Sequence, residues 1–138
     1  MSRSSTEIII HFVWATKKRE AALTAQWEPI VYRCIQQECR RLGCTILALG
    51  GMPDHVHLLA VVPGHLAVSK LMQQVKGVSA RFTNGELPLT LFLKWQEGYH
   101  ALSVSRSDVQ RVKSYIQCQK QHHADGTSQQ DWEPLAED

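Results

Sequence analysis

The sequence lacks the features that mark membrane-spanning, secreted and zinc-finger proteins. No apolar run approaches the roughly 20 residues that a membrane-spanning helix needs, and the longest run near the start, 8–15, is interrupted by His11. Glu7 precedes that run and basic residues follow it, the reverse of the charge order in a secretory signal peptide. The four cysteines form neither a C-x-x-C pair nor a zinc-finger spacing. We therefore expect a cytoplasmic protein without membrane contact, whose cysteines are small buried apolar side chains.

Internal repeats and low-complexity segments are also missing, and 138 residues suffice for one domain. Hydrophobic residues make up 43% of the chain, which excludes a disordered protein. The last 15 residues contain five acidic and no basic residues, so the first 123 carry 15 basic against eight acidic ones. A charge of this sign can attract phosphate backbones. We predict one domain over 1–123 and an acidic, polar tail over 124–138 that is mobile or loosely docked.

Hydrophobic periodicity predicts the order strand, helix, strand, strand, helix, strand. The strands are expected over 7–16, 44–49 and 54–62, with one or two more within 89–104, and the helices over about 28–42 and 68–82. Glycine-containing turns are expected at 50–53 and 84–85. This order is the split βαβ arrangement of a ferredoxin-like, RRM-like α+β fold: an antiparallel sheet with both helices on one face. A third helix over about 107–123 follows a capping box of Ser105 and Asp108, and belongs on or near the other face.

Two histidines one residue apart, His55 and His57, lie inside the predicted third strand. Strand side chains alternate between faces, so both imidazoles point away from the face that Val56 and Leu58 present to the helices. The histidines are then about 7 Å apart along the strand, a spacing at which two nitrogens can bind one metal ion. Two ordinary surface or core histidines would give the same short pattern.

On the predicted third helix, Tyr115 and Gln119 are four residues apart and so lie one above the other. Both flank the apolar stripe of this helix, at the rim of its contact with the sheet, where they could lie over His55 and His57. A half-buried tyrosine beside an exposed glutamine is the simpler interpretation of this pattern. His122 is a candidate proton acceptor near the tyrosine, or a helix-end histidine that interacts with the helix dipole.

Four segments together resemble the single-tyrosine HUH transposases of the IS200/IS605 insertion-sequence group. They are MPDHVHLL, SKLMQQVKGVSARF, KWQEGYHALSVS and VKSYIQCQKQHH, and they follow the family's order within 8–123. The resemblance implies that Tyr115 is the catalytic nucleophile and that His55, His57 and Gln119 hold a divalent metal, Mg²⁺ or Mn²⁺. No motif position departs from the family pattern, while the stretch after Gly126 is not covered by the resemblance.

The implied function is DNA transposition by cleavage and rejoining of single-stranded DNA. Attack by the tyrosine forms a 5′-phosphotyrosine bond and releases a 3′-OH, so the bond energy is kept for rejoining. A divalent metal would stabilise the charge that develops on the phosphate. The resemblance further implies DNA ends with subterminal hairpins and a homodimer with two sites, assembled in cis or in trans.

Basic and aromatic residues provide candidate contacts to a single strand. The candidates for phosphates are Lys17, Lys18, Arg19, Lys70, Lys76 and Arg81, and those for base stacking are Trp14, Phe92 and Trp95. Solvated charges and core aromatics are the simpler interpretations.

Two other functions remain open. A non-catalytic or domesticated nucleic-acid-binding protein of this fold would not need the two histidines, the tyrosine and the glutamine together. A metal-dependent phosphodiesterase would use the histidines to activate water and would leave no protein-bound product. An H-x-H-x-H hydrolase is disfavoured, because Leu59 occupies the third position.

Overall fold

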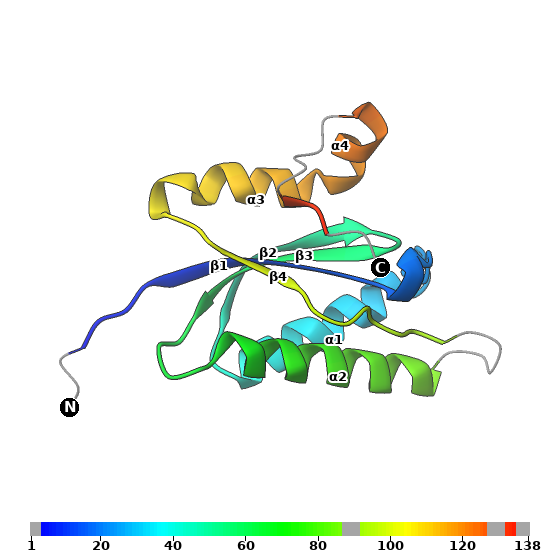
Figure 1. Cartoon of the computed structure of the whole chain (residues 1–138), viewed down its shortest axis with the longest axis horizontal. Helices are drawn as coiled ribbons and strands as arrows, with labels where there is room; N and C mark the ends of the chain where they lie inside the picture. The colour runs from blue at the N-terminus through cyan, green and yellow to red at the C-terminus, as the bar shows by residue number, and fades with distance from the viewer. Residues whose placement is uncertain (1–3, 87–91, 127–131, 135–138) are drawn as a thin grey trace.

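The computed structural model describes residues 4–86, 92–126 and 132–134 and contains two layers of helices around one sheet (Figure 1). The strands are β1 (Ile8–Ala15), β2 (Thr45–Met52), β3 (His55–Val62) and β4 (His100–Ser103). The helices are α1 (Glu28–Arg41), α2 (Val68–Glu86), α3 (Val109–Gln117) and α4 (Gln119–Asp125), with short 3-10 turns η1 (Lys17–Arg19) and η2 (Arg106–Asp108). In the described ranges, no helix is both long and apolar enough to cross a bilayer.

The sheet has the strand order β2-β3-β1-β4, and every neighbouring pair is antiparallel. Strands β1 and β3 therefore form the centre, where both of their edges are paired. The predicted ferredoxin-like α+β fold is confirmed by this order and by the two helices that follow β1 and β3.

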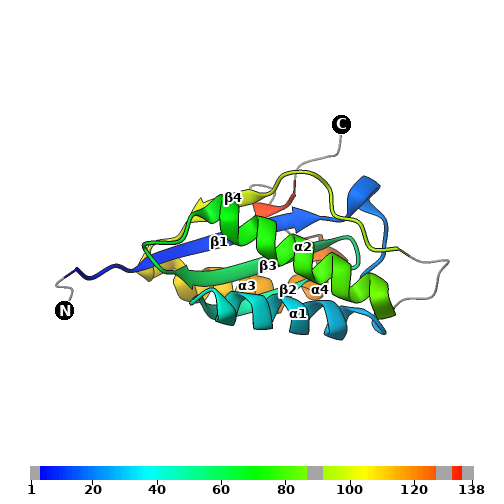
Figure 2. The ribbon, with the colours of Figure 1, turned by 90° about the horizontal axis from the view of Figure 1, so that it is seen from below.

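Helices α1 and α2 cover one face of the sheet (Figure 2). Alternate residues of each central strand point into this layer, as the period of a half-buried strand requires. The main core is formed by Phe12, Trp14, Val56, Leu58, Val31, Ile35, Leu71 and Val75, together with neighbouring apolar residues. Because every one of these side chains is nearly inaccessible to solvent, this layer supplies most of the hydrophobic stabilisation.

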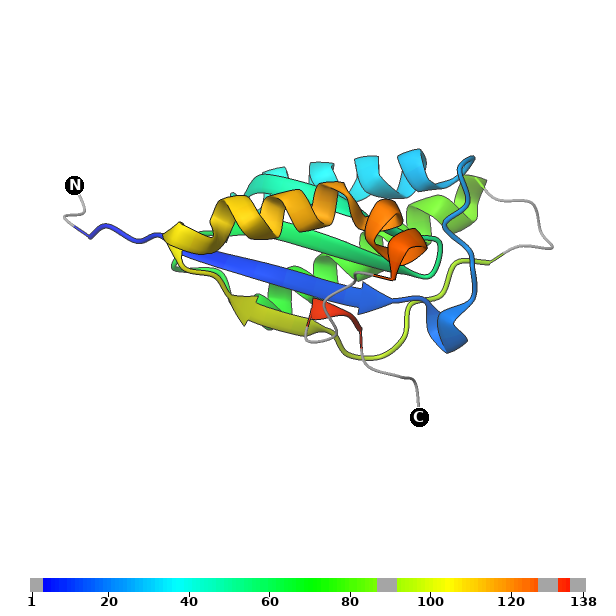
Figure 3. The same ribbon diagram turned by 90° about the horizontal axis from the view of Figure 1, so that it is seen from above.

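Helices α3 and α4 lie on the opposite face (Figure 3), where the third helix was expected. The core of this layer is smaller: Ile9, Ala48 and Leu59 of the sheet contact Val112 and Ile116 of α3. Gly50 of β2 lets the helix come close, because a Cβ built there would be 2.5 Å from the carbonyl oxygen of Ile116. The sheet thus has a well-packed structural face and a second face on which α3 is docked.

The predicted third helix is broken. It forms η2, α3 and α4, and the backbone leaves the helical conformation at Cys118 (φ −106°, ψ 26°). The expected capping box also differs, since the Ser105 hydroxyl bonds the Asp108 carboxylate (3.0 Å) instead of a backbone N–H. Tyr115 and Gln119 therefore belong to two consecutive helices.

One predicted turn is shifted and one is wrong: the chain between β2 and β3 turns at Pro53 and Asp54, after both glycines, and no turn interrupts α2 at 84–85. Strand β2 continues through Gly50 and Gly51 to Met52, because the glycines allow close contacts with α3 and with β3. Helix α2 continues through Asn84 and Gly85 to Glu86. The Asn84 side chain there bonds both backbone groups of Leu93, at 2.9 and 2.6 Å, and so fixes the chain that returns to the sheet.

The strand prediction for 89–104 is confirmed only over β4, with an isolated bridge between Trp95 and Thr16. Its beginning lies outside the described residues. The proposed boundary at 123/124 falls inside α4. The expected loose tail is described over 124–126 and 132–134. Residues 124–126 are exposed, whereas 132–134 are half-buried and lie against the α3 layer, with Trp132 packed on its core.

Candidate active site

Strand β3 places His55 and His57 side by side under the α3 layer. Their ring centroids are 5.1 Å apart, and the two side chains are 1% and 0% exposed. Val56 and Leu58 point into the main core on the other face, as the alternation predicts. The histidines were expected on a free face, but α3, α4 and segment 132–134 cover them, so they form a buried site.

Helix α3 brings Tyr115 onto this pair of histidines. The tyrosine ring lies edge-on to His57, with ring centroids 5.8 Å apart, and only 4% of the residue is exposed. Gln119, the first residue of α4, places its Oε1 atom 3.0 Å from Nε2 of His55. The four residues singled out by the sequence therefore meet within a single chain.

His55 is held from behind by an acidic residue and an arginine. Its Nδ1 atom is 2.7 Å from Oδ1 of Asp54, and the other oxygen of Asp54 accepts a hydrogen bond from Nε of Arg19 at 3.0 Å. Burial opposes the charged form of His55, but the hydrogen bonds to Asp54 and Glu133 outweigh it and raise its pKa to about 9. A carboxylate behind a histidine fixes the ring orientation, as is common for metal-binding histidines.

His57 is held by another histidine, His11 of β1, which sequence reasoning did not assign to the site. Nε2 of His11 lies 2.9 Å from Nδ1 of His57, and the rings are stacked. Burial and the neighbouring His57 lower the pKa of His11 to about 3, so it is neutral at pH 7. The sequence could have indicated this contact, because alternation along β1 places His11 on the same face as Ile9, which packs against α3.

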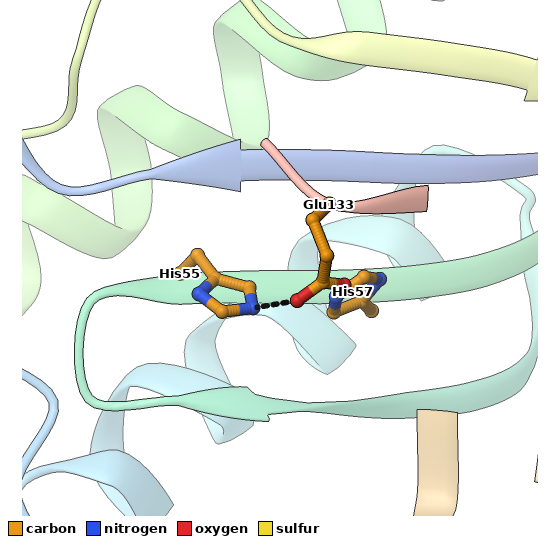
Figure 4. Close-up of side chains that lie close together, drawn as sticks. All are labelled: His55, His57 and Glu133. Atoms are coloured by element: carbon orange, nitrogen blue, oxygen red, sulfur yellow. Dashed lines mark ion pairs between the residues drawn. The ribbon is translucent and has the colours of Figure 1, made fainter. Parts of the chain in front are cut away.

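Glu133, also missed by sequence reasoning, lies between the two histidines (Figure 4). Its Oε1 atom is 3.2 Å from Nε2 of His55, and its Oε2 atom is 2.9 Å from Nε2 of His57. Oε2 also accepts a hydrogen bond from the Tyr115 hydroxyl at 3.0 Å. Burial would raise the pKa of Glu133, but the hydrogen bonds with His55 and His57 hold it far below its ordinary value. No local motif predicts this contact, because it joins distant parts of the chain.

His123, the residue after the candidate proton acceptor His122, also reaches the site. His123 contacts Oε1 of Gln119 (2.9 Å) and Oε1 of Glu133 through its Nε2 atom. The side chain of His122 itself lies outside the described part of the structure.

These donors fit a divalent cation. One ligand atom from each of His55, His57 and Glu133 lies within 4.8 Å of the others. His11 occupies Nδ1 of His57, so the other ring nitrogen, the buried Nε2, faces the Glu133 carboxylate at 2.9 Å. Imidazole nitrogens with amide or carboxylate oxygens form the mixed donor set that Mn²⁺, Mg²⁺ and Zn²⁺ can accept.

The six candidate phosphate contacts do not surround this site. Arg19 is engaged by Asp54, at the edge of the site, and Lys17 and Lys18 lie beside it in η1. Lys70 and Arg81 are exposed on α2, across the sheet.

Lys76 also lies on α2, where it donates hydrogen bonds to the carbonyls of Gln96 and Gly98, both at 2.8 Å. Its ammonium group therefore fixes the chain before β4.

Of the aromatic candidates for base stacking, two belong to the core. Trp14 is 1% exposed and Trp95 is 8% exposed, so neither ring is available to a base. Phe92 is 67% exposed. The expectation of buried cysteines is confirmed for Cys34, Cys39 and Cys44, while Cys118, at the break between α3 and α4, is exposed.

Comparison with known proteins identifies the family. A family model described as "Transposase IS200 like" matches residues 4–119. The ISDra2 transposase TnpA of Deinococcus radiodurans is 26% identical over 117 residues, which cover 79% of this chain and 81% of the relative. The IS200 transposase of Salmonella typhimurium is 26% identical over 114 residues, which cover 79% of this chain and 74% of the relative.

Solved structures share the fold. A candidate transposase from Deinococcus radiodurans superposes with a TM-score of 0.70 at 22% identity, covering 92% of this chain and 95% of its own. A REP-associated tyrosine transposase bound to a REP hairpin superposes with a TM-score of 0.67 at 17% identity, covering 100% and 94%. With the family match over most of the chain, this protein belongs to the IS200-like transposases and is an enzyme of DNA transposition.

Proposed function

We propose that the protein cleaves and rejoins single-stranded DNA, with Tyr115 as the nucleophile and a divalent metal held by His55, His57 and Gln119. The observation that carries the proposal is the convergence of these side chains. The tyrosine ring contacts His57, and the Gln119 oxygen lies 3.0 Å from the His55 nitrogen. A packing role alone would not require a buried phenol beside two buried imidazoles and an amide oxygen.

The reaction is a transesterification at phosphorus. Oη of Tyr115 attacks, the bond from phosphorus to the 3′ oxygen breaks, and the products are a 5′-phosphotyrosine and a free 3′-OH. A bound divalent cation would polarise the phosphate oxygens and stabilise the developing charge. His11 and Asp54 hold the rings of His57 and His55 in place, so the nitrogen donors are oriented before substrate arrives.

The proposed substrate is single-stranded DNA that carries hairpins, as the hairpin bound to the structurally similar transposase suggests. Mg²⁺ or Mn²⁺ is the proposed metal, and the cytoplasm, where bacterial DNA lies, the proposed location. Lys17, Lys18, Arg19, Lys70 and Arg81 remain proposed phosphate contacts; Lys76 is a weaker candidate because its ammonium group is engaged by two carbonyls.

The test is formation of a covalent adduct. Purified protein is incubated with labelled single-stranded hairpins from the DNA that flanks the gene, with Mg²⁺ or Mn²⁺, and analysed on a denaturing gel. We expect an adduct that is lost in Tyr115→Phe and in His57→Ala. Tyr32→Phe is the matched control, because this tyrosine belongs to the α1 layer. Cleavage that survives Tyr115→Phe would identify a phosphodiesterase that uses water.

A homodimer with two sites is part of the proposal, because two DNA ends require two nucleophiles. The structure has Tyr115 over the histidines of its own chain, which supports assembly in cis. Mixing Tyr115→Phe with His57→Ala tests this arrangement. Sites assembled in cis stay inactive in the mixture, whereas exchange of α3 between subunits would restore adduct formation. Light scattering gives the number of subunits.

A further inference from the structure

Segment 132–134 covers the proposed nucleophile with an aromatic ring. The Trp132 ring lies edge-on to Tyr115, with centroids 5.0 Å apart, and edge-on to His11 at 5.9 Å. The guanidinium group of Arg111 lies 5.3 Å from the centroid of the same ring. Aromatic rings and guanidinium planes are the groups on which proteins stack unpaired bases. The indole therefore occupies a place with the composition of a base-binding subsite.

The next residue fills the place of an anion. The two carboxylate oxygens of Glu133 lie 2.9 and 3.2 Å from the imidazole nitrogens of His57 and His55, and one of them is 3.0 Å from Oη of Tyr115. A scissile phosphate must come within about 3–3.5 Å of the attacking oxygen, on the side of the metal ligands. The carboxylate and the phosphate of a DNA strand would need the same space.

We propose that Trp132 and Glu133 fill a nucleotide subsite of the active site, the indole in place of an unpaired base next to the scissile bond and the carboxylate in place of its phosphate. The inference rests on the proposed function, since it takes the phosphate in this subsite to be the one that Tyr115 attacks. It also defines a form of regulation: segment 132–134 competes with the DNA strand and must leave before the strand can bind. The base subsite consists of Tyr115, His11 and Arg111.

The negative charge of Glu133 is consistent with a segment that competes with DNA. A carboxylate at the site repels phosphate in the absence of metal, and its own charge is stabilised by His55 and His57. A permanent ligand role for Glu133 is the contrasting interpretation, because a carboxylate with two histidines can bind a metal ion. The two roles predict opposite effects on DNA binding when Glu133 is changed.

The first experiment measures binding of a labelled single-stranded oligonucleotide to the full chain in EDTA, by fluorescence anisotropy. Glu133→Gln and Trp132→Ala should each tighten binding by about tenfold, if the segment fills the subsite in about nine molecules of ten. Glu86→Gln, the same charge change at an exposed residue at the end of α2, should bind like wild type. Because Trp132→Ala changes no charge, a gain in both site variants would identify occupancy of the subsite, not charge, as the cause.

The second experiment follows the segment itself. Acrylamide quenching of the Trp132 signal, taken as the difference between wild type and Trp132→Phe, should increase when the oligonucleotide is added, because the ring leaves its contact with Tyr115. Unchanged quenching, or greater protection, overturns the proposal, since the segment would then remain in place. Thermal unfolding of each variant checks that the α3 layer is still folded.

Other outcomes separate this inference from the proposed function. If Glu133→Gln weakens Mn²⁺ binding in calorimetry about a hundredfold and does not tighten DNA binding, Glu133 is a metal ligand and the competitor role is wrong. If both site variants bind DNA more tightly but no variant forms an adduct with either metal, the competition stands and the tyrosine mechanism fails. If wild type forms an adduct but both variants bind DNA with unchanged affinity, the tyrosine mechanism stands and the competition is wrong.

Discussion

Replacement of Gly50 by alanine should displace α3, the helix that carries the proposed nucleophile. The added Cβ would lie 2.5 Å from the carbonyl oxygen of Ile116 and 3.4 Å from its carbonyl carbon. Carbon and oxygen atoms in such contacts are normally about 3.3–3.6 Å apart, so α3 must move by about 1 Å. The obstacle is backbone at both positions, and no side-chain rotation can relieve it. We expect a loss of about 1–3 kcal/mol in the free energy of unfolding, the usual cost of overpacking.

The effect on activity should exceed the effect on stability. Tyr115 precedes Ile116, and a displacement of about 1 Å can reduce the rate of a reaction about a hundredfold. Urea unfolding gives the stability, and single-turnover adduct formation at a temperature where the variant is folded gives the rate. Gly77→Ala is the matched control: nothing lies within 4 Å of its Cβ, and alanine should stabilise α2 by about 0.5–1 kcal/mol. If Gly50→Ala unfolds at the wild-type urea concentration and forms adduct at the wild-type rate, the close packing of α3 on β2 is wrong.

Three further predictions concern thiols, metal and ring orientation. Cys118 alone among the four cysteines should react rapidly with a thiol reagent in the native protein, and all four should react after unfolding. Burial raises the pKa of Cys39 to about 12 and also shields Cys34 and Cys44. A second rapidly reacting thiol in the native protein would contradict this packing. Mn²⁺ at about 100 times its Kd should stabilise the fold by about 2.7 kcal/mol, and this gain should vanish in His57→Ala when both are compared by thermal unfolding. Asp54→Asn should weaken Mn²⁺ binding about tenfold in calorimetry by releasing the ring of His55, and unchanged affinity would show that the ring is oriented by other contacts.

Alternation along single strands was enough to predict much of this site. A period of two places His55 and His57 on the face opposite Val56, whatever the rest of the fold does. The same rule, applied to β1, would have selected His11 as well. The order of strands and helices likewise restricted the topology to few choices, of which the ferredoxin-like one is observed.

Contacts between distant segments could not be predicted in this way. Glu133 is 76 residues beyond His57, and its position depends on how α4 redirects the chain after Cys118. The break at Cys118 itself has no glycine or proline signal. Similarly, Asn84-Gly85 is locally typical of a turn, but α2 continues to Glu86, and the Asn84 side chain donates to the carbonyl of Leu93 and accepts from its N–H.

The unequal cores on the two faces of the sheet affect how easily each helical layer opens. The apolar core between α3 and the sheet has five buried side chains, while a much larger apolar set joins α1 and α2 to the sheet. The α3 layer can therefore separate from the sheet at a lower free energy than global unfolding requires. Because Tyr115, the proposed nucleophile, is almost fully buried in that layer, we expect partial opening of the layer, and not unfolding of the whole domain, to set how often solvent reaches its hydroxyl when segment 132–134 is in place.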